Sequence, residues 1–174
     1  MKQIMMVLIV LGGLASTATQ AGDLFERKAG LWKITIQGSS AASTRTVEQC
    51  LAADTDALLA RKELATTTAL CSKFEAHRTG NTFITDAMCK AGNHTSSSHT
   101  VTTAVNDGAY HTVVTTHDEN ATASGKTNKV FTHEGHWAGA CPATMQPGDQ
   151  ILHVGPQMPN GIKTNLLQAP SLAR

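Results

Sequence analysis

The side chains best suited to chemistry in this sequence belong to its four cysteines and eight histidines. No two cysteines form a Cys-x-x-Cys pair, and all of them come well after the apolar N-terminal run: Cys50, Cys71, Cys89 and Cys141. An even number of cysteines in an exported chain indicates disulfides rather than a metal centre or free thiols. We therefore predict two disulfide bonds and an oxidising compartment.

Four cysteines can pair in three ways, and the turn between Cys71 and Cys89 bears on the choice. A three-residue loop at Thr79-Gly80-Asn81 would place these two cysteines face to face and leave Cys50 for Cys141. A two-residue turn would shift the register by one and favour Cys50 with Cys71 and Cys89 with Cys141. We favour the first scheme, in which each bond would contribute roughly 2 to 4 kcal/mol.

The histidines suggest at most a surface metal site. The stretch His133-Glu134-Gly135-His136 is one residue short of the zinc-protease motif, and on a strand its two histidines would point to opposite faces. His111 and His117 would share a strand face, but about 20 Å of extended chain separates them. They could hold zinc, copper or nickel only with a further ligand from a loop or the next strand.

No arrangement of residues predicts catalysis. The sequence contains neither a Gly-x-Ser-x-Gly elbow nor a glycine-rich phosphate loop, and its acidic residues are scattered. We therefore expect no catalytic residue, no enzymatic activity and no cofactor. Nucleic-acid binding is also disfavoured, because lysines and arginines form no cluster.

The N-terminus predicts export. Lys2, the apolar run from Ile4 to Leu14 and the small residues up to Ala21 have the pattern of a secretory signal, and the apolar run is too short to span a bilayer. Removal of residues 1–21 would leave roughly 150 residues, which suits one domain. We predict a β-rich domain at 22–141, a proline-containing tail at 142–174, and a periplasmic or secreted location with no membrane span.

The elements that would position these residues are mostly strands. Trp32, Ile34 and Ile36 alternate with polar residues, as in a half-buried strand, and residues 43–50 can return beside it. Asp54 is a candidate N-cap for a short helix that includes residues 57–62.

Two hairpins and a last long strand follow. The first hairpin spans residues 71–89, and residues 99–116 form the second, with a turn at Asp107-Gly108 that would pair Val105 with Tyr110. Its predicted core face comprises Val101, Val105, Tyr110 and Val114, and its wet face comprises Thr100, Thr102, His111, Thr115 and His117. The last long strand covers 129–141. The tail is expected to be irregular, with a short strand at 151–154.

These elements predict a mainly β fold, an antiparallel meander of about seven strands curled into a partial barrel, with one short helix. Four stretches in this order resemble an exported bacterial family catalogued as domain of unknown function 3617: residues 28–35, residues 49–51 with the helix behind them, Cys71 and Cys89 around residues 79–82, and residues 135–141. The resemblance implies export, two disulfides and a compact β-rich domain, and it assigns no catalytic residue.

A binding role is the leading hypothesis. A small apolar ligand would lie inside the curled sheet against Trp32, Tyr110, Val114 and Trp137, or an envelope protein would dock on the sheet edge or tail. One alternative is an accessory protein for metal handling or envelope stress that uses the histidine-bearing face. The other is an enzyme of unknown class.

Overall fold

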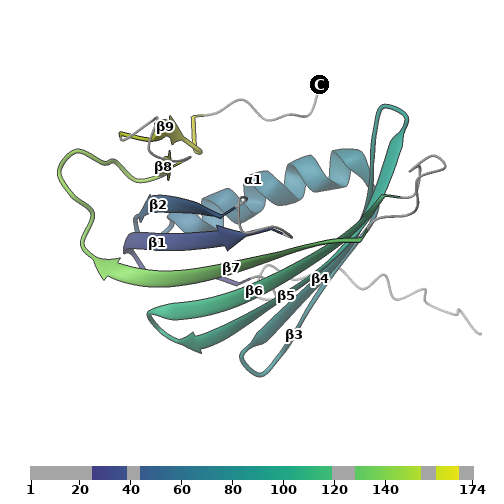
Figure 1. The fold of residues 1–174 in the computed structure, drawn as a ribbon, viewed down its shortest axis with the longest axis horizontal. Helices are drawn as coiled ribbons and strands as arrows, with labels where there is room; N and C mark the ends of the chain where they lie inside the picture. The colour runs from purple at the N-terminus through teal and green to yellow at the C-terminus, as the bar shows by residue number, and fades with distance from the viewer. Residues whose placement is uncertain (1–24, 39–43, 119–127, 154–159, 169–174) are drawn as a thin grey trace, which may run out of the picture.

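Nine antiparallel strands form one sheet in the computed structural model, which describes residues 25–38, 44–118, 128–153 and 160–168 (Figure 1). The strands are β1 (Gly30–Gln37), β2 (Arg45–Leu51), β3 (Cys71–Thr79), β4 (Thr82–Ala91), β5 (His94–Asn106), β6 (Ala109–Asp118), β7 (Asn128–Gly139), β8 (Asp149–His153) and β9 (Ile162–Asn165). Their order is β3-β4-β5-β6-β7-β1-β2-β8-β9, so the two edge strands do not pair. The predicted partial barrel is confirmed. The predicted export signal lies outside the described residues.

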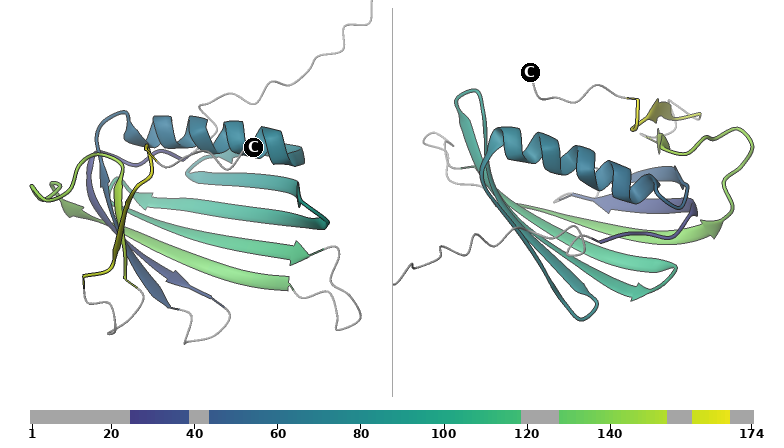
Figure 2. Two further views of the ribbon diagram at one scale, coloured as in Figure 1. Left: turned by 90° about the horizontal axis from the view of Figure 1, so that it is seen from above. Right: turned by 180° about the vertical axis from the view of Figure 1, so that it is seen from behind.

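Helix α1 (Thr55–Leu70) crosses the concave side of this sheet (Figure 2). It begins directly after Asp54, as predicted, and continues well beyond residue 62. The Asp54 side chain makes no capping hydrogen bond; instead, the Thr55 hydroxyl accepts one from the Ala52 N–H at 2.8 Å. The helix has no pronounced apolar face, and Leu58 and Leu70 are exposed. It therefore cannot fill the concave side of the sheet with apolar side chains.

Strand β1 lies in the middle of the sheet between β7 and β2, and it carries the core. The side chains of Trp32 and Ile34 are 1% and 7% exposed and pack with Val47, Leu51 and Tyr110. The Trp32 indole N–H donates a hydrogen bond to the Lys28 carbonyl at 2.9 Å. The alternation of Trp32, Ile34 and Ile36 therefore predicted the core strand correctly.

The predicted register of the second hairpin is wrong by one residue. Tyr110 pairs with Ala104 and Ala109 pairs with Asn106, so Val105 is an extra residue that forms a bulge and is 65% exposed. Because side chains alternate with period two, one extra residue exchanges the faces of everything before it on β5. Thr100 and Thr102 therefore join Tyr110 and Val114 on the concave face, whereas Val101 lies with His111 on the convex face.

A second bulge decides the disulfide pairing. The β3–β4 turn has only two residues, Gly80 and Asn81. We expected a turn of this length to shift the register by one and place Cys71 and Cys89 on opposite faces. The register shifts between Cys71 and Lys73, and this bulge restores Cys71 to the position opposite Cys89. The favoured scheme is thus present for a different reason: the disulfides join Cys71 to Cys89 and Cys50 to Cys141.

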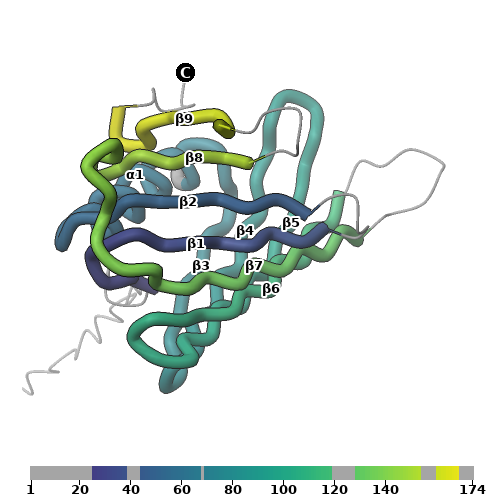
Figure 3. The backbone as a smooth tube through the Cα atoms, turned by 60° about the vertical axis from the view of Figure 1, so that its left-hand side comes forward, coloured from purple at the N-terminus to yellow at the C-terminus, as the bar shows by residue number. Residues whose placement is uncertain are grey.

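The segment after Cys141 contains more strand than we expected. Strand β8 pairs with β2, and β9 pairs with β8, so both extend the sheet beyond β2 (Figure 3). The Asp149 carboxylate at the start of β8 joins this strand to β9 and to the segment before it. It accepts hydrogen bonds from the Gln146 N–H at 2.7 Å and the Asn165 side chain at 2.9 Å, and it forms an ion pair with Lys163 at 2.8 Å.

Candidate functional site

A cavity of about 810 Å³ lies between the concave face of the sheet and helix α1. Strands β1, β2, β5, β6, β7 and β8 form its floor, and the helix contributes Asp56, Leu59, Ala60 and Glu63 as its roof. The volume is in the range of small-molecule sites. It exists because the sheet curves away from a helix that has no apolar face to fill the space.

The cavity floor consists of cross-strand rows, which the register defines. One row is largely apolar and runs through Ala104, Tyr110, Gly135, Ile34, Val47 and Leu152. Gly135 is required there, because a Cβ atom at this position would lie 2.0 Å from the Tyr110 ring. Another row, on the far side, contains Thr100, Val114 and Phe131. The cavity floor therefore has an apolar surface on both sides of a middle row.

The middle row is polar. Thr102 is the partner of Thr112, and Thr112 is the partner of His133, on strands β5, β6 and β7. The two threonine side chains are buried, and their hydroxyl oxygens lie 2.9 Å apart. Burial lowers the pKa of His133, so its imidazole is neutral at pH 7. Uncharged hydrogen-bonding groups thus form the part of this row that lies on β5, β6 and β7, and the row continues through Ile36 to the exposed Arg45 at its end.

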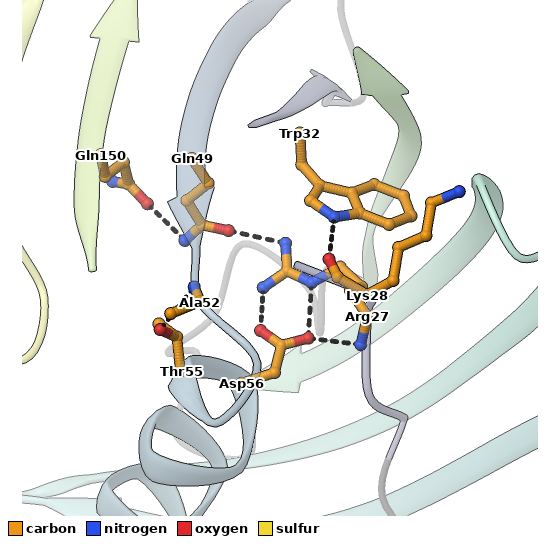
Figure 4. Close-up of polar contacts among 8 residues, drawn as sticks. All are labelled: Arg27, Lys28, Trp32, Gln49, Ala52, Thr55, Asp56 and Gln150. Carbon is orange, nitrogen blue, oxygen red and sulfur yellow. Dashed lines mark hydrogen bonds and ion pairs between the residues drawn. The ribbon is translucent and has the colours of Figure 1, made fainter. Parts of the chain in front are cut away.

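A buried ion pair lines the cavity at the start of helix α1 (Figure 4). The Arg27 guanidinium donates to both Asp56 carboxylate oxygens, at 2.9 and 2.6 Å, and to the Gln49 side chain at 2.6 Å. The Arg27 backbone N–H also donates to Asp56 at 2.6 Å, and Gln49 in turn donates to Gln150. Burial lowers the pKa of Arg27, but the hydrogen bond and charge of Asp56, with a smaller contribution from Tyr110, together outweigh this and the pKa is raised.

A second cleft, of about 630 Å³, adjoins the cavity and shares Phe25 and Arg27 with it. Phe25 contacts the rings of Phe83 and Tyr110, with centroids 5.3 and 5.0 Å apart. Burial raises the pKa of Tyr110 although Arg27 opposes this shift, so the phenol stays neutral at pH 7. The segment at Phe25 therefore forms a partition between two spaces.

The structure separates the four predicted ligand-binding residues. Tyr110 and Val114 line the cavity, whereas Trp32 lines the adjoining cleft. Trp137 lines neither space. Its indole is 40% exposed, donates to the Ala29 carbonyl at 2.9 Å and lies beneath the Lys28 ammonium, 4.1 Å from the ring centroid. Binding by the first three remains a prediction, and Trp137 is placed to hold the chain that enters β1.

The predicted metal residues lie on the opposite side of the sheet. His111 and His117 both face the convex side, where His111 is 3.8 Å from Glu134 and His117 is 2.7 Å from the Asn128 side chain. In the described part of the chain, no three histidine, cysteine or acidic side chains gather as a metal site would require. Metal binding here remains a prediction.

No pattern in the sequence identified Arg27, Asp56, Thr102, Thr112 and His133 as residues that line one cavity. Arg27 and Asp56 are 29 residues apart, and no local pattern links them. Thr102 and Thr112 were assigned to neighbouring strands but to opposite faces, because the bulge at Val105 was not foreseen. The available signal for this part of the site was a pair of threonines on the two strands of one hairpin.

Comparisons with known proteins give a family but no role. A family model described as a protein of unknown function, DUF3617, matches residues 27–141. Neither the curated proteins nor the solved structures that were compared give a match. In the described ranges, no helix has the length and apolar character needed to cross a bilayer. Since the matched residues make up well over half of the sequence, the chain belongs to this family of unknown function.

Proposed function

We propose that this protein binds a small, mostly apolar molecule in the cavity between its sheet and helix, and that it does so without catalysing a reaction. The observation that carries the proposal is the cavity itself, about 810 Å³ of partly open space between the sheet and the helix, with apolar side chains on its floor. A filled interior would instead have favoured a partner protein on the surface.

The proposed location is the periplasm or the extracellular space. Two disulfides agree with an oxidising compartment, and the secretory pattern of residues 1–21 agrees with export. A binding protein in such a compartment would protect an apolar molecule from water during transfer. The exposed sheet edge β3 leaves a surface on which a donor or acceptor of the ligand could dock.

A fluorescent probe can test the cavity directly. N-phenyl-1-naphthylamine is uncharged and becomes bright in apolar surroundings, so titration of the mature protein should give saturable fluorescence. Val114→Trp should weaken this binding at least tenfold, because the larger side chain fills the cavity floor. Val113→Trp is the matched control, since the neighbouring side chain on β6 faces the convex side.

The two variants separate cavity binding from surface binding. Equal loss in both, or no saturable binding by the unsubstituted protein, would contradict the proposal. Circular dichroism of each variant should match that of the unsubstituted protein, which shows that any loss reflects the occupied space.

A further inference from the structure

We propose that the ligand is an uncharged amphiphile whose apolar body lies across the concave floor and whose hydrogen-bond acceptor, such as a carbonyl or hydroxyl oxygen, is bound in the middle by Thr102, Thr112 and His133. This inference rests on the proposed function and names the chemical class of the ligand. It follows from the order of rows on the floor: apolar, polar, apolar.

The threonine pair has a hydrogen to donate. Each hydroxyl carries one hydrogen and two lone pairs. One hydrogen joins the two oxygens of Thr102 and Thr112, which leaves the other hydroxyl hydrogen in need of an acceptor. Among the described residues, no other hydrogen bond is made by either side chain. This hydrogen is therefore available to an acceptor that enters the cavity in place of water.

His133 extends the same row. It lies opposite Thr112, and side chains of directly paired residues are about 4.5 to 5.5 Å apart at their Cβ atoms. Neither ring nitrogen of His133 bonds to another group in the described ranges. A neutral imidazole has one donor and one acceptor nitrogen, so it can bind a hydroxyl or a carbonyl group beside the threonines.

The charges around the cavity disfavour a charged ligand. Arg27 is neutralised by Asp56, which accepts two hydrogen bonds from the guanidinium, and both residues line the cavity. The other charged lining residues are Arg45 on β2 and Glu63 on the helix, which are both exposed and of opposite sign. A carboxylate or ammonium group inside would lose its hydration, and the exposed Arg45 and Glu63 side chains, which water and salt screen, would offset little of that loss. An uncharged polar group avoids that cost.

A series of chain-matched competitors can test this chemistry on the unsubstituted protein. 6-Undecanone carries its carbonyl in mid-chain, undecanoate is an anion, and decyltrimethylammonium is a cation. We expect the ketone to displace N-phenyl-1-naphthylamine at a concentration at least tenfold lower than either ion. Equal or tighter binding of an ion would overturn the inference and leave the cavity proposal intact.

Variants then test the polar row itself. Replacing Thr102→Val and Thr112→Val together preserves side-chain shape and removes both hydroxyls. The affinity for 6-undecanone should fall about tenfold, while the affinity for the fluorescent probe should stay within about threefold. The control pair is Thr103→Val with Thr115→Val, on the same two strands but on the convex face, and it should change neither affinity.

The results distinguish the two proposals. If the probe binds but the Thr102/Thr112 variant keeps its full ketone affinity, the polar row does not recognise the ligand and only cavity binding stands. If the probe fails to bind the unsubstituted protein, both proposals fall. The competitor series does not depend on how well any variant folds.

Discussion

Burial of the Arg27 charge costs free energy, and the ion pair with Asp56 offsets this cost. The two side chains are only 13% and 8% exposed, and the carboxylate accepts both guanidinium hydrogen bonds as well as the Arg27 backbone N–H. Asp56 also lies in the first turn of α1, where the helix dipole favours a negative charge. This one residue therefore ties the entry of β1 to the helix that roofs the cavity.

Removing the carboxylate should be strongly destabilising. Asp56→Ala leaves the Arg27 charge buried without a partner, which costs about 3 to 5 kcal/mol of unfolding free energy. Urea denaturation followed by circular dichroism measures this change. The control is Glu75→Ala at the Lys73–Glu75 pair, where both side chains are more than half exposed and the expected cost is below about 1 kcal/mol.

A small loss of unfolding free energy in Asp56→Ala, comparable to that in Glu75→Ala, would show that water reaches Arg27 and that this end of the cavity is open.

Neither Arg27 nor Asp56 was singled out from the sequence. Their separation of 29 residues gives no spacing signal, and a single arginine just before a strand carries no signal of its own. Only the folded chain brings them together.

Among the elements, β8 and β9 depend on Asp149. The Gln146 N–H, Lys163 and Asn165 all stabilise its charged form and lower the pKa of Asp149 to about 2, below its ordinary value of 3.8. A depressed pKa in the folded state stabilises the protein wherever the unfolded chain is still ionised. The contribution is therefore complete above pH 4 to 5 and is lost as the pH falls toward 2.

The pH dependence of Asp149→Asn tests this element. The variant should be less stable than the unsubstituted protein at pH 6, and the difference should shrink as the pH falls from about 4 to 2. Urea midpoints at pH 6, 4 and 2 give the comparison. Asp107→Asn, at an exposed turn, serves as the control. A difference for Asp149→Asn that is the same at all three pH values would refute the assignment.

The elements could largely be predicted, but their registers could not. The alternation of Trp32, Ile34 and Ile36 identified β1, and Asp54 identified the start of α1. The bulges at Val105 on β5 and at Ser72 on β3 could not be predicted. An extra residue changes the alignment of a strand with its neighbour, and the apolar pattern along the strand does not reveal that change. The predicted register placed the site residues Thr102 and Thr112 on opposite faces because it did not include the bulge at Val105.

At the scale of the molecule, β1 joins strands that are far apart in the sequence. This strand pairs with β2, its neighbour in sequence, and with β7, about a hundred residues later. The Cys50–Cys141 disulfide joins β2 to the segment that follows β7, with a sequence separation of 91. The sequence indicated a curled sheet and this bond, but it offered no means to place β8 and β9 beyond β2, because nothing local specifies such long-range pairing.

The two disulfides should contribute unequally. A cross-link restricts the unfolded chain more when it closes a longer loop, and this relation gives about 4.5 kcal/mol for a separation of 91 and about 3 kcal/mol for 18. Cys50→Ala with Cys141→Ala should therefore lower the unfolding free energy by more than Cys71→Ala with Cys89→Ala. Urea denaturation of both variants, with reduced unsubstituted protein as the reference for loss of both bonds, measures the difference. A larger loss from the Cys71–Cys89 pair would mean that the edge hairpin, rather than the β2–β1–β7 junction, limits the stability of the sheet.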